Sequence, residues 1–391
     1  MRLIGTSAMG IRLPIIGHGD DLVSIVCDHV MATVNASGQP LKDSDIIGVT
    51  EGIVAKAEGN FASLDDIAAD VSAKFGGKEI GLVYPMLSRN RFVNILKGIA
   101  RGAKKVHILL SYPSDEVGNP VMDITKIDEV QDALGGKMAT AKEFVTACGG
   151  IYAHTFTGVN YIDLYQNAAS NISIYFSNNP RDILSITKNI IVGEIHARNH
   201  TKARLLRAGA KKVLTLSDIL ATSVNGSGHN PAFGVLGSNL STDNSLKLFP
   251  ARAHEFVHAV QATLKLKTGV APEVLVYGDG AFKDPVCGIW ELADPVVSPG
   301  YTARLGGQPD EIKMKFVADN AFGDLDASQR LAAVSDTIKS KHENPDAYRE
   351  GTTPRIFADL VGSLCDLLGG SGDKGTPVML IRGYFDDFTA E

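Results

Sequence analysis

The chain lacks several features that would assign it quickly to a functional class. Its 391 residues include 38 basic and 44 acidic side chains, a net charge of −6, so it offers no basic field for nucleic acid. No apolar run approaches the roughly 18 residues that a membrane helix needs, and the first residues have no signal-peptide core. These absences predict a cytoplasmic protein that binds neither nucleic acid nor membranes.

Cysteine and the best-known nucleotide motifs are also scarce. The four cysteines are widely separated, without a C-x-x-C pair or a histidine at ligand spacing, at positions Cys27, Cys148, Cys287 and Cys365. This pattern indicates buried thiols in a reducing compartment. No strand candidate is followed by G-x-G-x-x-G, so a dinucleotide site is not supported, and no segment matches the standard P-loop.

Two segments near opposite ends of the chain do suggest phosphate binding. Thr50–Gly59 and Leu368–Pro377 each border an apolar run and carry a lysine, Lys56 or Lys374, close to glycines. Backbone N–H groups and an ammonium could therefore meet an anion together, and we interpret both segments as phosphate-binding turns. The alternative is that both are ordinary turns and that Lys56 is a solvated surface lysine.

Four further segments carry glycine, histidine or acidic residues beside apolar runs: Leu13–Asp21, Gly228–Asn239, Glu273–Gly280 and Arg355–Gly369. Asp279 follows a short strand in a Gly-Asp-Gly turn, where its carboxylate could bind a metal or could simply brace the turn. Asp20 and Asp21 precede an apolar helix and are best explained as its N-cap and first-turn charge. The last segment has helical spacing.

The middle of the chain alternates between strand-like and helix-like sequence patterns. Helical patterns at 91–103, 139–148 and 200–208 separate apolar strand candidates at 80–84, 106–110, 151–156, 172–176, 190–193 and 213–216. Such alternation is typical of βαβ units and a parallel sheet. Three polar residues follow these strands and could converge at the ligand crevice of such a sheet, namely Asp115, His154 and His196.

The order and the residue patterns of the terminal segments resemble those of the coenzyme F-420-0:L-glutamate ligase family, the CofE-like γ-glutamyl ligases. The resemblance covers residues 9–60 and 226–383, with Ile-Val-x-Lys-Ala-Glu-Gly at its centre and Pro-Val-x-x-Ile-Arg-Gly at its end. It implies an α+β fold in which a discontinuous CofE-like module, residues 1–77 and 221–391, is interrupted by an inserted α/β (Rossmann-like) domain, residues 78–220. It also implies a homodimer.

The activity implied by the resemblance is a γ-glutamyl amide ligation. A nucleoside triphosphate, GTP or ATP, would phosphorylate a small-molecule carboxylate acceptor with the help of Mn or Mg. The amino group of L-glutamate would then attack the acyl phosphate. Phosphates need N–H donors and lysine, and the metals need carboxylates, so the residue types fit this chemistry.

Carried over position by position, the resemblance implies catalytic roles for Lys56 and Asp279. It implies a nucleotide site comprising Leu13, Pro14, Ile15, Ile16, Glu51, Gly52, Lys56, Asn239, Gly370, Ser371, Gly372, Asp373 and Lys374. Asp279 would also bind metal. The chain departs from the family at Glu51-Gly52, which replaces a pair of hydroxyl residues, and at Leu236, which replaces a metal-binding aspartate. Asp243 and Asp284 are the candidate replacement ligands.

Two other functions remain open on the sequence. The chain could be a nucleotide-binding regulatory protein that has lost ligation, which Glu51 and Leu236 would favour. It could also be an enzyme whose acid–base groups are Asp115, His154 and His196 of the central region.

Overall fold

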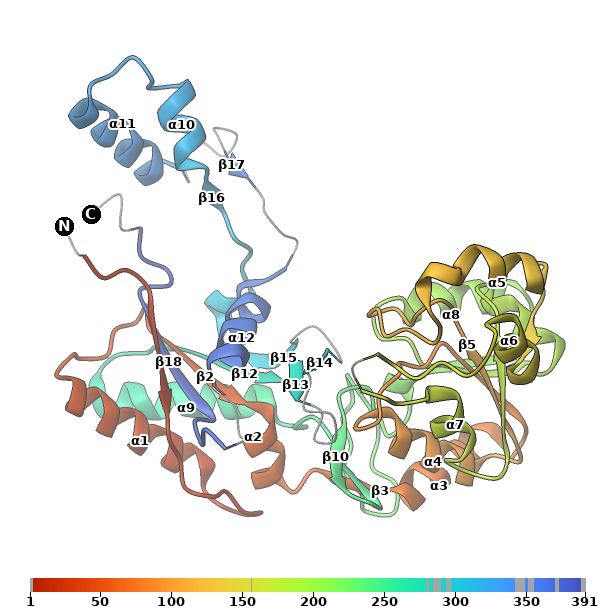
Figure 1. Ribbon diagram of the computed structural model, residues 1–391. Coiled ribbons are helices and arrows are strands. Elements are labelled where there is room, and N and C mark those ends of the chain that lie inside the picture. Colours follow the sequence, from red (N-terminus) through yellow and green to blue (C-terminus); the bar gives the residue numbers. More distant parts are fainter. Residues whose placement is uncertain are drawn as a thin grey trace. The chain divides into compact units, whose positions relative to one another are not determined.

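The structure is a computed structural model. It describes residues 3–155, 157–278, 281–283, 290–292, 297–341, 349–350, 355–369 and 373–387, with backbone only for 281–283, 290–292, 297 and 349–350. The chain forms two compact units, which we describe separately (Figure 1). Unit 1 consists of Met1–Val54, Arg252–Gly278 and Val296–Glu391, and unit 2 of Ala55–Ala251 and Asp279–Pro295. Helix α2 (Glu51–Glu58) begins in unit 1 and ends in unit 2.

Unit 1 is built on a mixed five-stranded sheet with the order β1-β18-β2-β12-β15. Its strands are β1 (Ser7–Ile11), β18 (Val378–Arg382), β2 (Ile46–Thr50), β12 (Glu273–Gly278) and β15 (Val297–Tyr301). β2 and β12 are parallel, and the other neighbours are antiparallel. Strands from opposite ends of the sequence therefore lie side by side in one sheet.

Helices cover both faces of this sheet (Figure 1). One face packs against α12 (Phe357–Leu368) through Ile46, Leu275 and Met379, and the other carries α9 (Ala253–Thr268) with α1 (Leu22–Ser37) packed beside it. Gly48 of β2 permits the close approach of α12, since a Cβ at this position would lie 2.4 Å from Sγ of Cys365. Asp21 rather than Asp20 is the N-cap of α1, and its carboxylate accepts a hydrogen bond from the Ser24 N–H. Both aspartates therefore lie before the helix, and the predicted charge in its first turn is absent.

The remaining part of unit 1 is a small helical pair joined to the sheet. α10 (Met314–Asn320) and α11 (Ala327–Lys339) bury Val317, Val334 and Ile338 between them. A short ribbon of β16 (Glu311–Ile312) and β17 (Arg349–Glu350) and the 3₁₀ turn η4 (Ala303–Gly306) accompany them.

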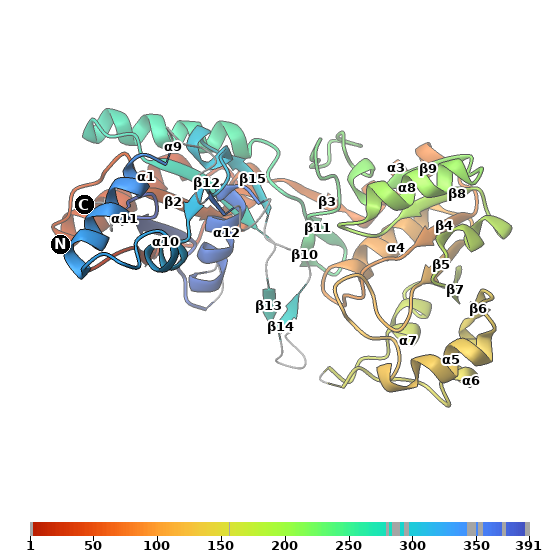
Figure 2. The same cartoon turned by 90° about the horizontal axis from the view of Figure 1, so that it is seen from above.

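Unit 2 contains a six-stranded sheet with the order β6-β7-β5-β4-β8-β9, which Figure 2 shows strand by strand. The strands are β4 (Ile80–Val83), β5 (Val106–Leu110), β6 (Ala139–Thr140), β7 (Ile172–Phe176), β8 (Asn189–Val192) and β9 (Lys212–Thr215). All are parallel except the edge strand β6. Counted along the chain, the parallel strands have the order 3-2-1-4-5 of doubly wound sheets.

Both faces of the parallel sheet are buried, as is usual for such sheets. One face packs against α3 (Leu64–Phe75) and α4 (Phe92–Gly102), which approach closely because Gly98 faces Ile67 and Gly102 faces Ala68. The other face packs against η2 (Pro180–Ser185) and α8 (Arg198–Arg207). The remaining described elements of the unit are η1 (Ile124–Lys126), α5 (Ile127–Leu134), α6 (Ala141–Ala147), α7 (Tyr161–Gln166), η3 (Leu216–Asp218), β13 (Ala281–Lys283) and β14 (Trp290–Leu292).

Unit 2 also holds the segments just outside the predicted insert. β3 (Phe61–Ser63) pairs with the hairpin of β10 (Asn239–Thr242) and β11 (Ser245–Lys247). The side chain of Asn60 donates to the carbonyls of His229 and Phe249 and accepts from the His229 N–H. Residues 55–77 and 221–251 are therefore tied to one another within this unit.

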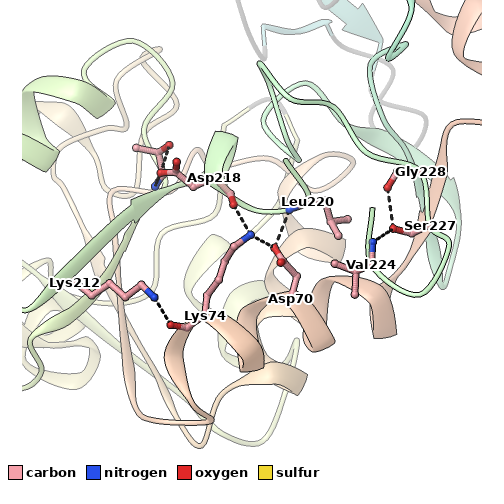
Figure 3. Close-up of polar contacts among 9 residues, drawn as sticks. Asp70, Lys74, Lys212, Asp218, Leu220, Val224, Ser227 and Gly228 are labelled. Carbon is pink, nitrogen blue, oxygen red and sulfur yellow. Dashed lines mark hydrogen bonds and ion pairs between the residues drawn. The ribbon is translucent and has the colours of Figure 1, made fainter. Parts of the chain in front are cut away.

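A cluster of polar contacts among Asp70, Lys74, Lys212, Asp218 and Leu220, which we call the polar clasp, reinforces that connection (Figure 3). The Asp70 carboxylate, on α3, accepts from the Leu220 N–H at 2.8 Å and from Lys74 Nζ at 2.5 Å. Lys74 Nζ also donates to the Asp218 carbonyl at 2.6 Å, and Lys212 Nζ donates to the Lys74 carbonyl. These contacts explain why the units divide at Val54/Ala55 and Ala251/Arg252, whereas the predicted segments divide at 77/78 and 220/221.

The structure confirms a mixed α/β fold with several sheets and corrects two local predictions. Residues 151–155 form no strand, because backbone groups of His154 bond locally to Gly158 and Val159. Thr50–Gly59 is not a glycine-rich turn, because residues 51–58 form helix α2. In the described part of the chain, no helix has both the length and the apolar character required to cross a bilayer.

Candidate functional site

Four predicted segments meet at one end of the unit 1 sheet. The register pairs Ile11 of β1 with Val378 of β18, and Val378 with Val49 of β2. The Thr50 N–H donates to the Pro377 carbonyl, and Thr50 pairs with Tyr277 of β12. Residues 12–16, 51–52, 278 and 373–377 therefore all lie at this end of the sheet, although they are far apart in the sequence.

The segment after β1 presents an apolar surface at this end. Ile16 is buried, Leu13 is half-buried, and Pro14 and Ile15 are exposed, with Ile15 93% exposed. The loop then turns into α1, where the Gly17 N–H donates to the Asp20 carboxylate at 2.7 Å. An exposed isoleucine beside a proline can contact the flat face of a base, which is the role that the resemblance implies.

Glu51 is the first residue of α2 and is only 5% exposed. Its side chain packs against Gly278, since a Cβ on Gly278 would lie 2.1 Å from Cγ of Glu51. The helix dipole stabilises a carboxylate at this position. A buried carboxylic acid, Glu51, therefore stands where the family has the first of its two hydroxyl residues. It lies at the end of the sheet, against Gly278, the last residue of β12.

The turn before β18 contributes charges of both signs. Asp373 and Lys374 are exposed, and Lys374 Nζ lies 3.5 Å from the Leu368 carbonyl at the end of α12. Gly375 has φ +62°, a conformation that favours glycine. The described residues of this segment therefore form a turn, as predicted. Gly370, Ser371 and Gly372 lie outside the described residues.

Lys56 lies on α2, five residues after Glu51, and its side chain is exposed. The Lys56 ammonium makes no hydrogen bond or ion pair with another described residue. Ile53, Val54 and Ala55 are buried, so the helix is held by its apolar face while the lysine remains available to an external anion. Lys56 therefore keeps the exposure that phosphate binding requires, on a helix rather than in a turn.

Asn239 and Asp243 belong to the β10–β11 hairpin of unit 2. Asn239 is half-buried, and its Oδ1 accepts from the Leu240 N–H at 2.8 Å. Asp243 is exposed at the hairpin turn, and its backbone carbonyl lies 3.5 Å from Nδ2 of Asn94. The Asp243 carboxylate has no hydrogen bond or ion pair with another described residue, so it is free to accept a ligand.

Leu236 does not stand in a polar environment. It packs against the buried side chains of Met86 and Ile195. A carboxylate at this position would be placed against two apolar side chains, so the local packing agrees with leucine rather than with a metal ligand.

The remaining predicted ligands, Asp279 and Asp284, lie outside the described residues. Within the described residues, no group of three or more His, Cys, Asp or Glu side chains is arranged to hold a metal. Sequence reasoning missed Tyr277, whose buried hydroxyl has no hydrogen-bond partner among the described residues. Burial raises the pKa of Tyr277, so the hydroxyl stays neutral. Its position just before the sequence Gly278-Asp279-Gly280 was the available signal.

The alternative residues of the central region have local roles. The Asp115 carboxylate accepts from the N–H groups of Leu87, Val117 and Asn119, and burial raises its pKa. The His154 ring accepts from the Thr157 N–H at 3.3 Å, and burial lowers its pKa. His196 is exposed, and its N–H donates to the Glu116 carboxylate. These contacts organise loops at the strand ends.

Comparison with known proteins agrees with the terminal segments. The family model described as F420-0:Gamma-glutamyl ligase matches residues 10–383. The coenzyme F420:L-glutamate ligase of Methanothermobacter thermautotrophicus is 36% identical over 93 residues, 22% of this chain and 35% of that protein. Those of Methanosarcina acetivorans and Methanosarcina mazei are 31% and 30% identical over 145 and 146 residues, in each case 32% of this chain and 52% of the relative.

The matched segments therefore span between 35% and 52% of the length of these relatives. The family model, in contrast, runs from the last residues of β1 to the residue after β18 and so includes both units. The chain belongs to the F420-0:gamma-glutamyl ligase family.

Proposed function

We propose that this protein is a ligase that forms a γ-glutamyl amide bond at the expense of a nucleoside triphosphate. The observation that carries the proposal is the meeting of residues 12–16, 51–52 and 373–377 at one end of the unit 1 sheet. The family match supports the same reaction. The coenzyme F420:L-glutamate ligases named above supply the analogy for L-glutamate as the amine donor.

The nucleotide is GTP or ATP. In our proposal, Leu13–Ile16 contact the base, and Lys56 and Lys374 bind phosphate oxygens, which the exposure of both lysines permits. Backbone groups of Gly52 and of residues 370–372 add N–H donors. Asn239 is retained as a nucleotide-contacting residue.

A divalent ion, Mn²⁺ or Mg²⁺, is part of the proposal, because it would neutralise the charge of the nucleotide. Glu51 is a buried carboxylate, and hard cations of this kind prefer carboxylate oxygen. We assign metal binding to Glu51 and Asp279, with Asp243 and Asp284 as further candidates. When bound, the ion neutralises charge on the phosphate oxygens. Glu51 stands where the family has a hydroxyl residue, and its negative charge would repel the phosphates of a nucleotide. If Glu51 binds the metal ion, the same charge stabilises the ion instead.

The proposed reaction has two steps. A carboxylate oxygen of the acceptor attacks the terminal phosphorus of the nucleotide, the bond to the leaving nucleoside diphosphate breaks, and an acyl phosphate forms. The resulting amide is a γ-glutamyl amide where this carboxylate is the γ-carboxylate of a glutamyl residue on the acceptor. The amine of L-glutamate, after losing a proton, attacks the acyl carbon, and inorganic phosphate leaves. Lys56 stabilises the charge that develops on the transferred phosphoryl group.

The acceptor is proposed to be F420-0 or another small carboxylate, such as a folate-like molecule. The protein is proposed to act as a homodimer, which light scattering on the purified protein will test.

The first experiment is a thermal-shift titration with GTP and ATP, each with and without Mn²⁺ or Mg²⁺. Binding to the native state at 100 times Kd stabilises a protein by about 2.7 kcal/mol, so a metal-dependent rise in Tm is expected. Lys56→Ala should abolish most of the rise. Lys78→Ala, which removes another exposed lysine, is the matched control and should leave it unchanged.

The second experiment measures ligation. The protein is incubated with L-glutamate, F420-0, nucleotide and metal, and mass spectrometry follows the addition of one glutamyl residue together with release of phosphate. Nucleotide binding without glutamyl transfer to any acceptor tested would contradict ligase activity. The absence of any nucleotide-dependent shift would contradict the proposed site itself.

A second candidate function follows from Leu236. Since this residue packs against Met86 and Ile195 and replaces a family metal ligand, the chain could retain nucleotide binding without ligation, as a regulatory protein. Metal-dependent nucleotide binding with no phosphate release in the presence of acceptors would favour this candidate.

A further inference from the structure

Two histidines on α9 form an exposed pair outside the proposed nucleotide site. His254 and His258 are four residues apart in the sequence His-Glu-Phe-Val-His, and both are exposed. Their ring centroids are 4.6 Å apart, and the rings are inclined at 81°. Residues four apart lie on the same face of a helix, so the contact follows from the spacing.

The separation of the rings agrees with shared coordination of one metal ion. With metal–nitrogen bonds near 2.0–2.1 Å and a tetrahedral angle between them, two imidazole centroids lie about 5 Å apart. The observed 4.6 Å is close to that value. Small side-chain rotations would therefore bring one nitrogen of each ring into coordination without movement of the helix.

The two rings make few other interactions. In the part of the chain that the structure describes, the ring contact between them is the only interaction recorded for either side chain. A neutral imidazole has a ring nitrogen with a lone pair, which can bind a metal ion.

The helix that carries the pair is firmly held. Phe256, Val257 and Val260 are buried on its opposite face. At its first turn, Gly300 of β15 packs so closely that a Cβ there would lie 2.5 Å from the backbone of Ala253. A fixed helix turn keeps two side chains in register, and this lowers the entropic cost of chelation.

From these observations we propose that His254 and His258 bind one transition-metal ion such as Zn²⁺, Ni²⁺ or Cu²⁺. Imidazole suits these ions, whereas Mg²⁺ and Mn²⁺ prefer carboxylate and water oxygen. The spacing also matches the H-E-x-x-H motif of zinc hydrolases. However, the described residues offer no third protein ligand, so water completes the coordination and hydrolysis is not implied.

Isothermal titration of the full-length, tag-free protein with ZnCl₂ and with NiCl₂, after removal of metals by a chelator, tests the proposal. One site is expected, with affinity that weakens at acidic pH because the ligands must be deprotonated. His254→Ala and His258→Ala should each weaken binding at least about tenfold, since even the loss of a residue that only supports a ligand costs 10–100-fold.

His18→Ala removes an exposed histidine elsewhere in unit 1 and serves as the control, expected to bind like the unaltered protein. Both α9 positions are solvent-facing, so the variants should fold, which circular dichroism will verify. Unchanged affinity in both α9 variants, or an equal loss in His18→Ala, would overturn the proposal. Binding of MnCl₂ at this pair as tight as that of ZnCl₂ would contradict the proposed choice of metal.

Discussion

Replacement of Asp70 by alanine should destabilise unit 2 by about 3 kcal/mol. The carboxylate is 5% exposed and accepts both the Leu220 N–H and the Lys74 ammonium (Figure 3). Its loss leaves the Leu220 N–H without a partner, which costs about 1–3 kcal/mol, and removes a bond to a charged group worth about 1.5–3 kcal/mol. Lys74 keeps its bond to the Asp218 carbonyl, so part of the cost is recovered.

Urea unfolding followed by circular dichroism measures this change, and thermal unfolding provides a second measure. For a domain of 150–250 residues, 1 kcal/mol corresponds to roughly 2–4 °C, so a fall in Tm of about 6–12 °C is expected.

Asp65→Ala is the matched control on the same helix. The Asp65 side chain is 82% exposed and pairs with Arg101 at the surface, an interaction worth about 0–1 kcal/mol. If Asp70→Ala costs no more than Asp65→Ala, the clasp does not stabilise the unit, and our explanation of the boundary at Val54/Ala55 is wrong.

Three further predictions concern single side chains. Gly278→Ala places a methyl group 2.1 Å from Cγ of Glu51, so it should lower the free energy of unfolding by about 1–3 kcal/mol. It should also remove the metal-dependent rise in Tm that the nucleotide causes. An unaltered rise in Tm would show that Glu51 is not needed for nucleotide binding. Burial raises the pKa of Glu194 from its ordinary 4.5 to about 7. Between pH 4.5 and about 7 the folded state therefore binds one proton more than the unfolded state. The free energy of unfolding should fall by about 3 kcal/mol as the pH rises through this range. Glu194→Gln should remove this fall, and equal pH dependence of the two proteins in urea titrations would refute the assignment. Burial raises the pKa of Cys27 to about 11 and also raises that of Cys365, so iodoacetamide at pH 8 should label neither until the protein is unfolded; early labelling seen by peptide mass spectrometry would contradict their burial.

The sequence predicted elements well where local pattern and tertiary packing agree. The strands at 106–110 and 172–176 are found at the predicted residues, because short runs rich in β-branched, leucine and aromatic side chains fit a sheet whose faces are covered. The start of α1 was predicted to within one residue, with Asp21 rather than Asp20 as its N-cap, because a cap depends on only three or four neighbouring residues.

Prediction failed at one segment where glycine was taken as the sign of a turn, and long-range contacts could not be predicted. Thr50–Gly59 was interpreted as a turn from its glycines, but buried Ile53, Val54 and Ala55 stabilise a helix in which Gly52 is tolerated. The contacts that tie residues 55–77 to residues 220–251 within unit 2 involve Asp70 and Asn60, whose partners lie about 150 or more residues away. The residues next to Asp70 and Asn60 in the sequence do not indicate which distant residues they will bond to.

The candidate site was predicted in part. The segments at 13–16, 51–52 and 373–374 were identified, but only the pairing of β1, β18 and β2 places them at the same end of one sheet. The interlocking of Glu51 with Gly278 could not be predicted, because it depends on the parallel pairing of strands more than 200 residues apart.

The position of β18 in the unit 1 sheet sets the order in which the molecule can be completed during synthesis. β18 lies between β1 and β2, so the first strand of the chain has no hydrogen-bonding partner until residues 378–382 have left the ribosome. The parallel sheet at 80–215 is finished long before then and can form while translation continues. The edge of β2 that pairs with β18 stays without its partner during that interval, and an unpaired strand edge can pair with another chain and so favours aggregation.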